Sequence, residues 1–214
     1  MNIKKHILAL ISLITATVTA DADIIVQPDT LKAGDTYRLI FVTEGTIDAT
    51  SDDLVTYQEF ARTQANSVPE LSALKVEWHP VVSVSSYGKN QDARNVIWAN
   101  PVGATPDPSP SAGFFTLAGE QIAKDNEDLW SGSIAAPVNM TQSGKTVDGA
   151  EQIVWTGTQK TGWAAKEALG KFPDGKTGRG SATTKEGGWL NAGTKPSKKE
   201  HSIYVISDII TVTN

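Results

Sequence analysis

The sequence predicts an α+β domain built on a mostly antiparallel sheet, with one or two helices and a long loop region. Two runs of apolar, β-branched and aromatic residues, at 37–43 and 203–212, are typical of strands. One segment, at 50–66, has apolar residues at helical spacing and is the clearest helix. A strand at 153–155 ends in a Trp, and a long Gly- and Lys-rich stretch separates it from the run at 203. This order is expected of a small sheet that carries one large loop.

The first 20 residues have the features of a secretory signal peptide. Lys4 and Lys5 precede a short apolar run at 7–14, and small residues at 18–20 suit a cleavage site. Cleavage after residue 20, or alternatively after residue 22, leaves a single domain of residues 23–214. The run is shorter than the roughly 20 residues that span a bilayer, so we expect no membrane span. We expect the protein to be secreted, periplasmic or on the cell surface; the alternative is a buried N-terminal helix.

Composition excludes several classes of site. Without the signal, 17 Lys and Arg stand against 24 Asp and Glu, a net charge of −7, which is not the signature of a nucleic-acid-binding protein. The chain has no cysteine, so it has no disulfide, thiolate zinc site or cysteine nucleophile. Stability must therefore come from the apolar core.

The first half of the mature chain contains the central strand and the main helix. A short strand at 23–27 is expected to end at Pro28. The run at 37–43 is apolar on both faces except at Arg38, which predicts a central strand covered on two sides. The helix at 50–66 is expected to begin with Thr50 as its N-cap. Pro69 then opens a short helical turn.

The remaining elements are shorter. Residues 75–85 form a strand that Pro80 confines to an edge or a bulge. The four prolines within 99–113 predict an extended excursion. A strand at 114–117 follows, then a turn. The terminal run is expected to break near Ser207 and to pair with the first strand, which brings the two chain ends together.

Six short segments resemble a group of uncharacterised secreted bacterial domains that look like the C-type lectin-like and endostatin-like folds. These segments are residues 39–43, 117–126, 128–132, 154–158, 187–189 and 203–206. The resemblance implies a C-type-lectin-like single domain, with its termini paired in one sheet and a long loop region between Trp155 and Tyr204.

Two departures limit what this resemblance implies about ligands. Lectin-like domains usually carry disulfides, and this chain has no cysteine. Sugar-binding members hold calcium with two residue triplets, and Trp189-Leu190-Asn191 lacks the Asp of the second triplet, while the first has no counterpart. Calcium-dependent sugar binding is therefore not carried over. We expect no cofactor, and calcium is left open.

Few residues are candidates for catalysis or metal binding. His79 and His201 lack the spacing of a metal site, and no G-x-S-x-G segment nominates a serine nucleophile. Asp125, Glu127 and Asp128 could bind calcium or act as a carboxylate pair, but a solvated helix face is the favoured interpretation. We expect no metal site and no catalytic residues.

Charge is distributed unevenly along the chain. Residues 165–214 contain eight Lys and Arg against five Asp and Glu, whereas residues 21–164 contain nine against nineteen. A basic loop with aromatic faces can hold an anionic or sugar ligand through charge and stacking. The alternative is that the lysines solubilise a Gly-rich loop and the Trp rings anchor it to the core. The candidate ligand-binding residues are Trp163, Lys176, Arg179, Lys185, Trp189, Asn191, Lys198 and Lys199.

The sequence thus predicts an exported, non-enzymatic binding or adhesion module for an acidic or cell-surface glycan or protein ligand. The alternative function is an extracytoplasmic polymer hydrolase that uses carboxylates such as Asp125 or Asp128. An enzyme should show a cleft with converging titratable groups, whereas a module should bind through a loop-built surface. A structural subunit of a surface assembly is a third hypothesis, and the oligomeric state is not indicated.

Overall fold

The computed structural model describes residues 22–86, 89–94, 112–147 and 152–213. The expected signal peptide and most of the proline-rich excursion lie outside these ranges. None of the described helices is long and apolar enough to cross a membrane.

A nearly fully buried strand, β1 (Thr36–Val42), lies at the centre of the sheet. It pairs antiparallel with β10 (Ser202–Ser207) on one side and parallel with β5 (Gly113–Thr116) on the other. Leu39 and Phe41 belong to one hydrophobic core, whereas Ile40 and Val42 belong to a second. Successive side chains of a strand point to opposite faces, so these two cores cover the two faces of the sheet. The prediction of a central strand covered on both sides is confirmed.

The sheet is mixed, and its strands follow the order β6-β5-β1-β10-β7-β8-β9. Only the β1–β5 and β10–β7 pairs are parallel among the described strands. The α+β class and the mostly antiparallel sheet are therefore confirmed. The outer strands of this order are β6 (Gln121–Ala123), β7 (Ile153–Trp155), β8 (Lys176–Ser181) and β9 (Thr194–Pro196).

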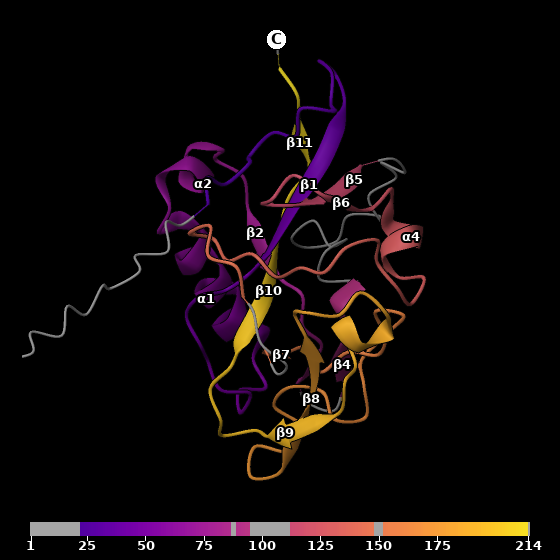
Figure 1. Ribbon diagram of the computed structural model, residues 1–214. Helices are drawn as coiled ribbons and strands as arrows, with labels where there is room; N and C mark the ends of the chain where they lie inside the picture. The colour runs from indigo at the N-terminus through magenta and orange to yellow at the C-terminus, as the bar shows by residue number, and fades with distance from the viewer. Residues whose placement is uncertain (1–21, 87–88, 95–111, 148–151, 214) are drawn as a thin grey trace, which may run out of the picture.

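Four short strands complete the large sheet and form a separate hairpin (Figure 1). β2 (Trp78–Pro80) pairs with β10, and β11 (Ile210–Thr211) pairs with β1. β3 (Val84–Ser86) and β4 (Lys89–Gln91) form a two-stranded hairpin.

The first and last strands of the sheet lie side by side, as the sequence predicts. Thr36 at the start of β1 is opposite Thr211 in β11, and Val42 at its end is opposite Tyr204 in β10. The expected break occurs after Ser207, whose hydroxyl accepts a 2.9 Å hydrogen bond from the backbone N–H of Leu39.

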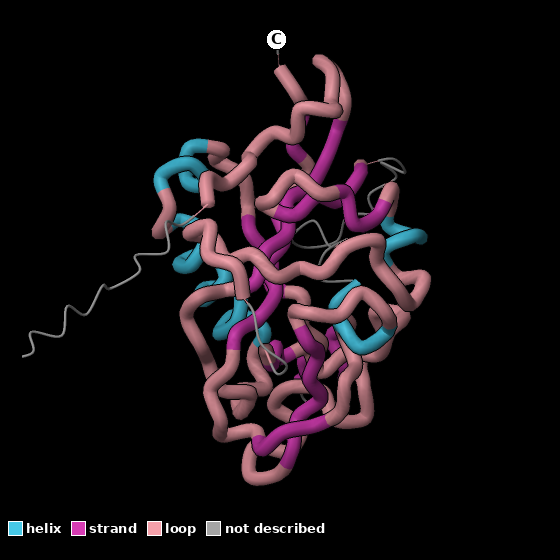
Figure 2. Tube along the Cα trace, viewed as in Figure 1, coloured by secondary structure: helices cyan, strands magenta, loops and turns pink. Residues whose placement is uncertain are grey.

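Two helices, α1 (Leu54–Asn66) and α2 (Pro69–Ala73), cover one face of the sheet (Figure 2). Helix α1 begins three residues later than predicted, because Asp53 rather than Thr50 is the N-cap. The Asp53 carboxylate accepts a 3.0 Å hydrogen bond from the backbone N–H of Val55. The helical turn predicted at Pro69 is confirmed as α2.

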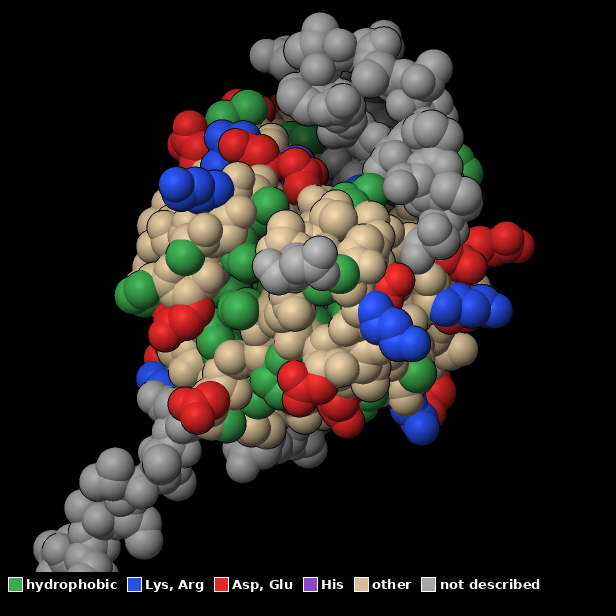
Figure 3. Space-filling view, turned by 90° about the horizontal axis from the view of Figure 1, so that it is seen from above, with side chains coloured by type: hydrophobic (Ala, Val, Ile, Leu, Met, Phe, Trp, Pro, Cys, Tyr) green, Lys and Arg blue, Asp and Glu red, His purple; other side chains and the backbone are tan. Residues whose placement is uncertain are grey.

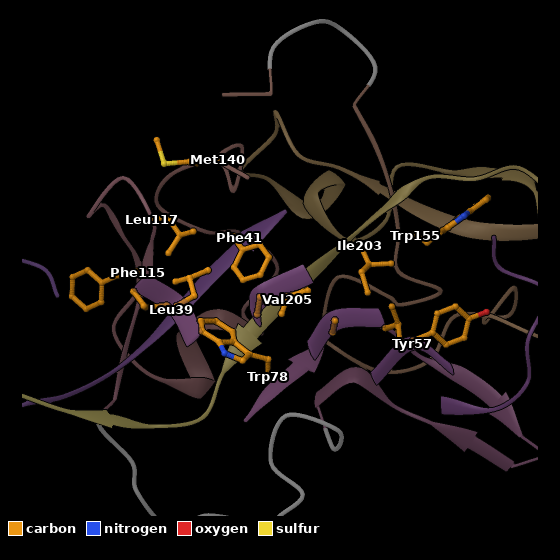
Figure 4. Packing of buried hydrophobic residues seen from close by; sticks show 14 of the residues in the cluster. Leu39, Phe41, Tyr57, Trp78, Phe115, Leu117, Met140, Trp155, Ile203 and Val205 are labelled. Carbon is orange, nitrogen blue, oxygen red and sulfur yellow. The ribbon is translucent and has the colours of Figure 1, made fainter. Parts of the chain in front are cut away.

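The core beneath these helices is rich in large side chains. Phe41 of β1 and Trp78 of β2 meet edge to face, with ring centroids 5.5 Å apart. Tyr57 of α1, Ile203 of β10 and Trp155 of β7 belong to the same cluster (Figure 4). Residues distant in the chain are thus joined in one apolar layer.

The other face of the sheet is covered mainly by loops, with the short helix α4 (Asn126–Leu129) and the 3-10 helix η1 (Gly187–Trp189). Trp189 lies between Trp130 and Tyr204, with ring centroids 6.3 and 5.6 Å away. All three rings are at least 95 % buried and belong to one core.

Two predictions about elements need correction. Residues 23–27 form no strand, and the segment is held by single contacts such as the 2.8 Å hydrogen bond from Ile25 N–H to the carbonyl of Leu117. The long loop expected between Trp155 and Tyr204 supplies strands β8 and β9 as well as η1. It extends the sheet because its backbone groups complete ladders with β7 and with one another.

A glycine lets η1 pack against β8. A Cβ at Gly180 would lie 1.9 Å from the carbonyl oxygen of Trp189, so no other residue fits without a backbone shift. This close approach allows Trp189 to reach the core.

Candidate functional site

The β8–β9 end of the sheet carries a group of basic side chains, Arg179, Lys195, Lys199 and His201, which we name the His201 cluster. Arg179 lies on β8 and Lys195 on β9, and the other two lie on the segment that leads into β10. Lys195 is opposite Thr177, two residues from Arg179 on the same strand, so Arg179 and Lys195 lie on the same face.

Backbone hydrogen bonds fix each member of the cluster. His201 exchanges two 3.0 Å backbone bonds with Ile47, and the indole N–H of Trp155 donates to the carbonyl of Lys199 at 3.2 Å. The N–H of Arg179 donates to the carbonyl of Gly193 at 2.9 Å. The four side chains therefore project from a rigid frame.

The electrostatics of the cluster are most visible at His201. Burial lowers the pKa of the imidazole, and the positive charges of Lys195, Arg179 and Lys199 lower it further. The ring of Trp155 also packs against it edge to face, with centroids 4.8 Å apart. Each cation opposes protonation of the imidazole, so the lowered pKa of His201 reflects the positive charge around it.

The three cationic side chains of the cluster have no ion-pair partner within the described part of the chain. None of the four ion pairs between described residues involves Arg179, Lys195 or Lys199. The Nε atom of Arg179 and the Nε2 atom of His201 are buried and make no hydrogen bond there. Unpaired buried polar atoms are costly, typically by about 1–3 kcal/mol each. Both atoms are out of reach of solvent, so an anionic group would meet the partly exposed side chains of Arg179 and Lys195 and the exposed side chain of Lys199.

The other predicted basic residues are placed differently. Lys198 pairs with Asp174 at 2.7 Å on the surface, so its charge is already offset. Lys176 is exposed at the start of β8, opposite Pro196 on β9. The side chains of Lys185 and Asn191 are also exposed, on the turns that flank η1. Of the predicted residues, only Arg179 and Lys199 interact with His201.

The two predicted tryptophans differ sharply. Trp163 is 47 % exposed at the tip of a tight loop, and the guanidinium of Arg94 lies over its ring at 4.5 Å. Trp189 is fully buried, so its ring is removed from any surface that a ligand could touch. Its burial fits the alternative in which a Trp anchors the excursion to the core.

Sequence analysis missed Lys195 and His201 as candidate site residues. Lys195 joins the cluster only through the β8–β9 register, and His201 has no motif around it. A usable signal was the run of basic residues at 195, 198 and 199 directly before a histidine and a buried strand.

The carboxylates proposed for hydrolysis take part in local structure. Asp125 is the N-cap of α4 and accepts a 2.8 Å hydrogen bond from the N–H of Asp128. The carboxylate of Asp128 accepts a 3.0 Å bond from the N–H of Lys124. These contacts give both residues a part in holding the local backbone. Among the residues with described positions, no three His, Asp or Glu side chains gather as a metal site would require.

No model of a known protein family matches this chain, and no curated protein matches it either. The resemblance to lectin-like domains stays a prediction, and the function must be argued from the residues themselves.

Proposed function

We propose that this protein is an exported, non-enzymatic recognition module that binds an acidic glycan through the His201 cluster. One observation carries the proposal: three cationic side chains lie close enough to a half-buried histidine to lower its pKa, and none of them forms an ion pair with another described residue.

The cluster suits an oxyanion such as a sulfate or a carboxylate. Arg and Lys donate charge-assisted hydrogen bonds to such groups, which are stronger than bonds between neutral partners. The cations come from neighbouring strands and one connecting segment, so they are concentrated in one small area. We favour an acidic glycan over an acidic protein patch, because a glycan repeats one oxyanion on each unit and can fill a small cationic centre without a large complementary surface.

Export is part of the proposal and rests on the N-terminal sequence. Outside the cytoplasm, a cysteine-free domain needs no disulfide if its core is sufficient, and here two cores cover the sheet. The lectin-like fold belongs to the same proposal.

A binding measurement with matched variants tests this function. The affinity for a sulfated oligosaccharide of the heparin type is measured by calorimetry at low and physiological salt. We expect weaker binding at the higher salt concentration, because ions screen exposed charges. Lys195→Gln combined with Lys199→Gln should weaken binding about tenfold or more.

Lys198→Gln is the matched control. It removes the same charge next to Lys199, but from a lysine that already pairs with Asp174. We expect less than a twofold effect. Equal losses from Lys198→Gln and Lys199→Gln would show that only net charge matters. Binding to an acidic peptide but not to the oligosaccharide would assign the cluster to a protein partner.

Within the described ranges, no contact of Asp125 or Asp128 favours the hydrolase alternative. Its test is release of reducing ends from acidic polysaccharides, with Asp128→Asn as the comparison. Turnover that this substitution abolishes would replace the binding proposal.

A further inference from the structure

A polar groove lies at the other end of the central strand from β8 and β9. It has a volume of about 480 Å³ and is formed by the turn before β1, the start of β5 and the edge strand β6. This volume falls in the range of small-molecule sites, roughly 300–1,000 Å³. Leu31 and the 3 % exposed edge of Phe115 contribute apolar surface, and Thr30, Thr36 and Gln121 contribute hydroxyl and amide groups.

Two opposite charges line this groove. Asp35 stands on the turn that enters β1, and Lys124 stands directly after β6. Within the described ranges they form no ion pair with one another or with any other side chain. Figure 3 shows this end of the molecule, where acidic and basic side chains are interspersed rather than gathered by sign. The lining of the groove therefore includes one charge of each sign.

Both charged residues are held by their backbones. The Asp35 carboxylate accepts a 2.8 Å hydrogen bond from the N–H of Lys32, which leaves its other oxygen for a ligand. The carbonyl of Asp35 accepts from Val212 N–H at 2.9 Å, and the N–H of Lys124 donates to Asp128 at 3.0 Å. Only the side-chain ends remain free to adjust.

We propose that this groove binds a small zwitterion, an amino acid or a short peptide with free ends. Its ammonium group contacts Asp35, and its carboxylate contacts Lys124. The apolar part of the ligand packs against Leu31, and Thr36 and Gln121 hydrogen-bond to the amide group of a peptide ligand. A ligand with a single charge would satisfy only one wall. This site is separate from the His201 cluster, and the proposal does not depend on acidic-glycan binding.

The test is a titration of the purified protein with alanyl-alanine, followed by backbone amide shifts of Gly34 and Gly113. Both glycines line the groove. We expect saturable shifts there. N-acetylation or C-amidation of the dipeptide should each weaken binding about fivefold or more, because each removes one charged contact.

Variants separate a specific site from general attraction. Asp35→Asn keeps an oxygen that can accept from Lys32, so the turn should persist while affinity falls about fivefold. Lys124→Gln should have the same effect, whereas Lys32→Gln, which removes a nearby charge outside the groove, should change affinity less than twofold. Shifts that do not saturate, equal binding of the doubly capped dipeptide, or binding of maltose in its place would overturn the proposal.

Discussion

Gly180→Ala tests whether the Gly- and Lys-rich excursion is packed onto the sheet as described. The new Cβ would lie 1.9 Å from the carbonyl oxygen of Trp189 and 2.8 Å from its carbonyl carbon. Both atoms are backbone, so no side-chain rotation relieves the contact. Reaching an ordinary separation of 3.4 Å requires η1 to move by about 1.5 Å from β8. That movement pulls Trp189 out of its contacts with Trp130 and Tyr204.

We expect Gly180→Ala to lower the free energy of unfolding by about 3 kcal/mol, the upper part of the range for overpacked cores. Gly178→Ala is the matched control, because it lies two residues away on the same strand and the same face. Its new Cβ would meet nothing closer than 3.4 Å. Its free energy of unfolding should change by less than about 1 kcal/mol.

Urea denaturation followed by circular dichroism measures both variants. Tryptophan fluorescence reports the movement of Trp189 directly, and its maximum should shift to longer wavelength only in Gly180→Ala. Two variants of equal stability, or a Gly180→Ala protein with unchanged fluorescence, would show that η1 does not pack on β8 as described.

Three further predictions follow from single contacts. Lys199→Gln should raise the pKa of His201, as measured by an NMR titration. Because the pKa of His201 lies below its ordinary 6.5, the native state binds fewer protons than the unfolded chain, and the protein loses stability as the pH falls below 6.5. The variant should lose less stability than the wild type over the same pH range. In the wild type, the 2.8 Å contact with His79 lowers the pKa of Asp208, and Asp208→Asn weakens this contact. Well above pH 3.8 the wild type should therefore be more stable than the variant, by less than about 1 kcal/mol, and the difference should vanish as the pH falls through the pKa of Asp208 in the folded protein. Urea unfolding curves recorded across this pH range measure the difference. Asp53→Ala should cost about 1 kcal/mol in thermal unfolding, the effect of losing an N-cap, and an unchanged melting temperature would contradict its assignment.

The elements that sequence analysis predicted best are those with strong apolar patterns. Residues 37–43 and 203–207 are apolar runs, and both became buried strands of the sheet. Strand β8 could not be predicted in this way, because Lys176-Thr177-Gly178-Arg179-Gly180-Ser181 has no apolar side chain and two glycines. Its ladder partners on β7 and β9 and its close contact with Trp189 are tertiary features.

The candidate site was predictable only in its composition. The excess of basic residues after residue 165 pointed to the correct part of the chain for the His201 cluster. It could not separate Lys199, which interacts with His201, from Lys198, which pairs with Asp174. Neighbouring residues in an irregular segment project in different directions, and only the fold determines which of them meet. Trp189 was assigned to the ligand because a lone Trp in a Gly-rich stretch shows no periodicity that reveals burial.

The most direct test of the proposed function is the imidazole resonance of His201 during a titration with a sulfated disaccharide. A bound anion offsets the charges of Arg179, Lys195 and Lys199, so the pKa of His201 should rise toward or above 6.5, and the resonance should shift saturably. A resonance and a pKa that stay unchanged at saturating ligand would contradict the assignment of this cluster as the binding site.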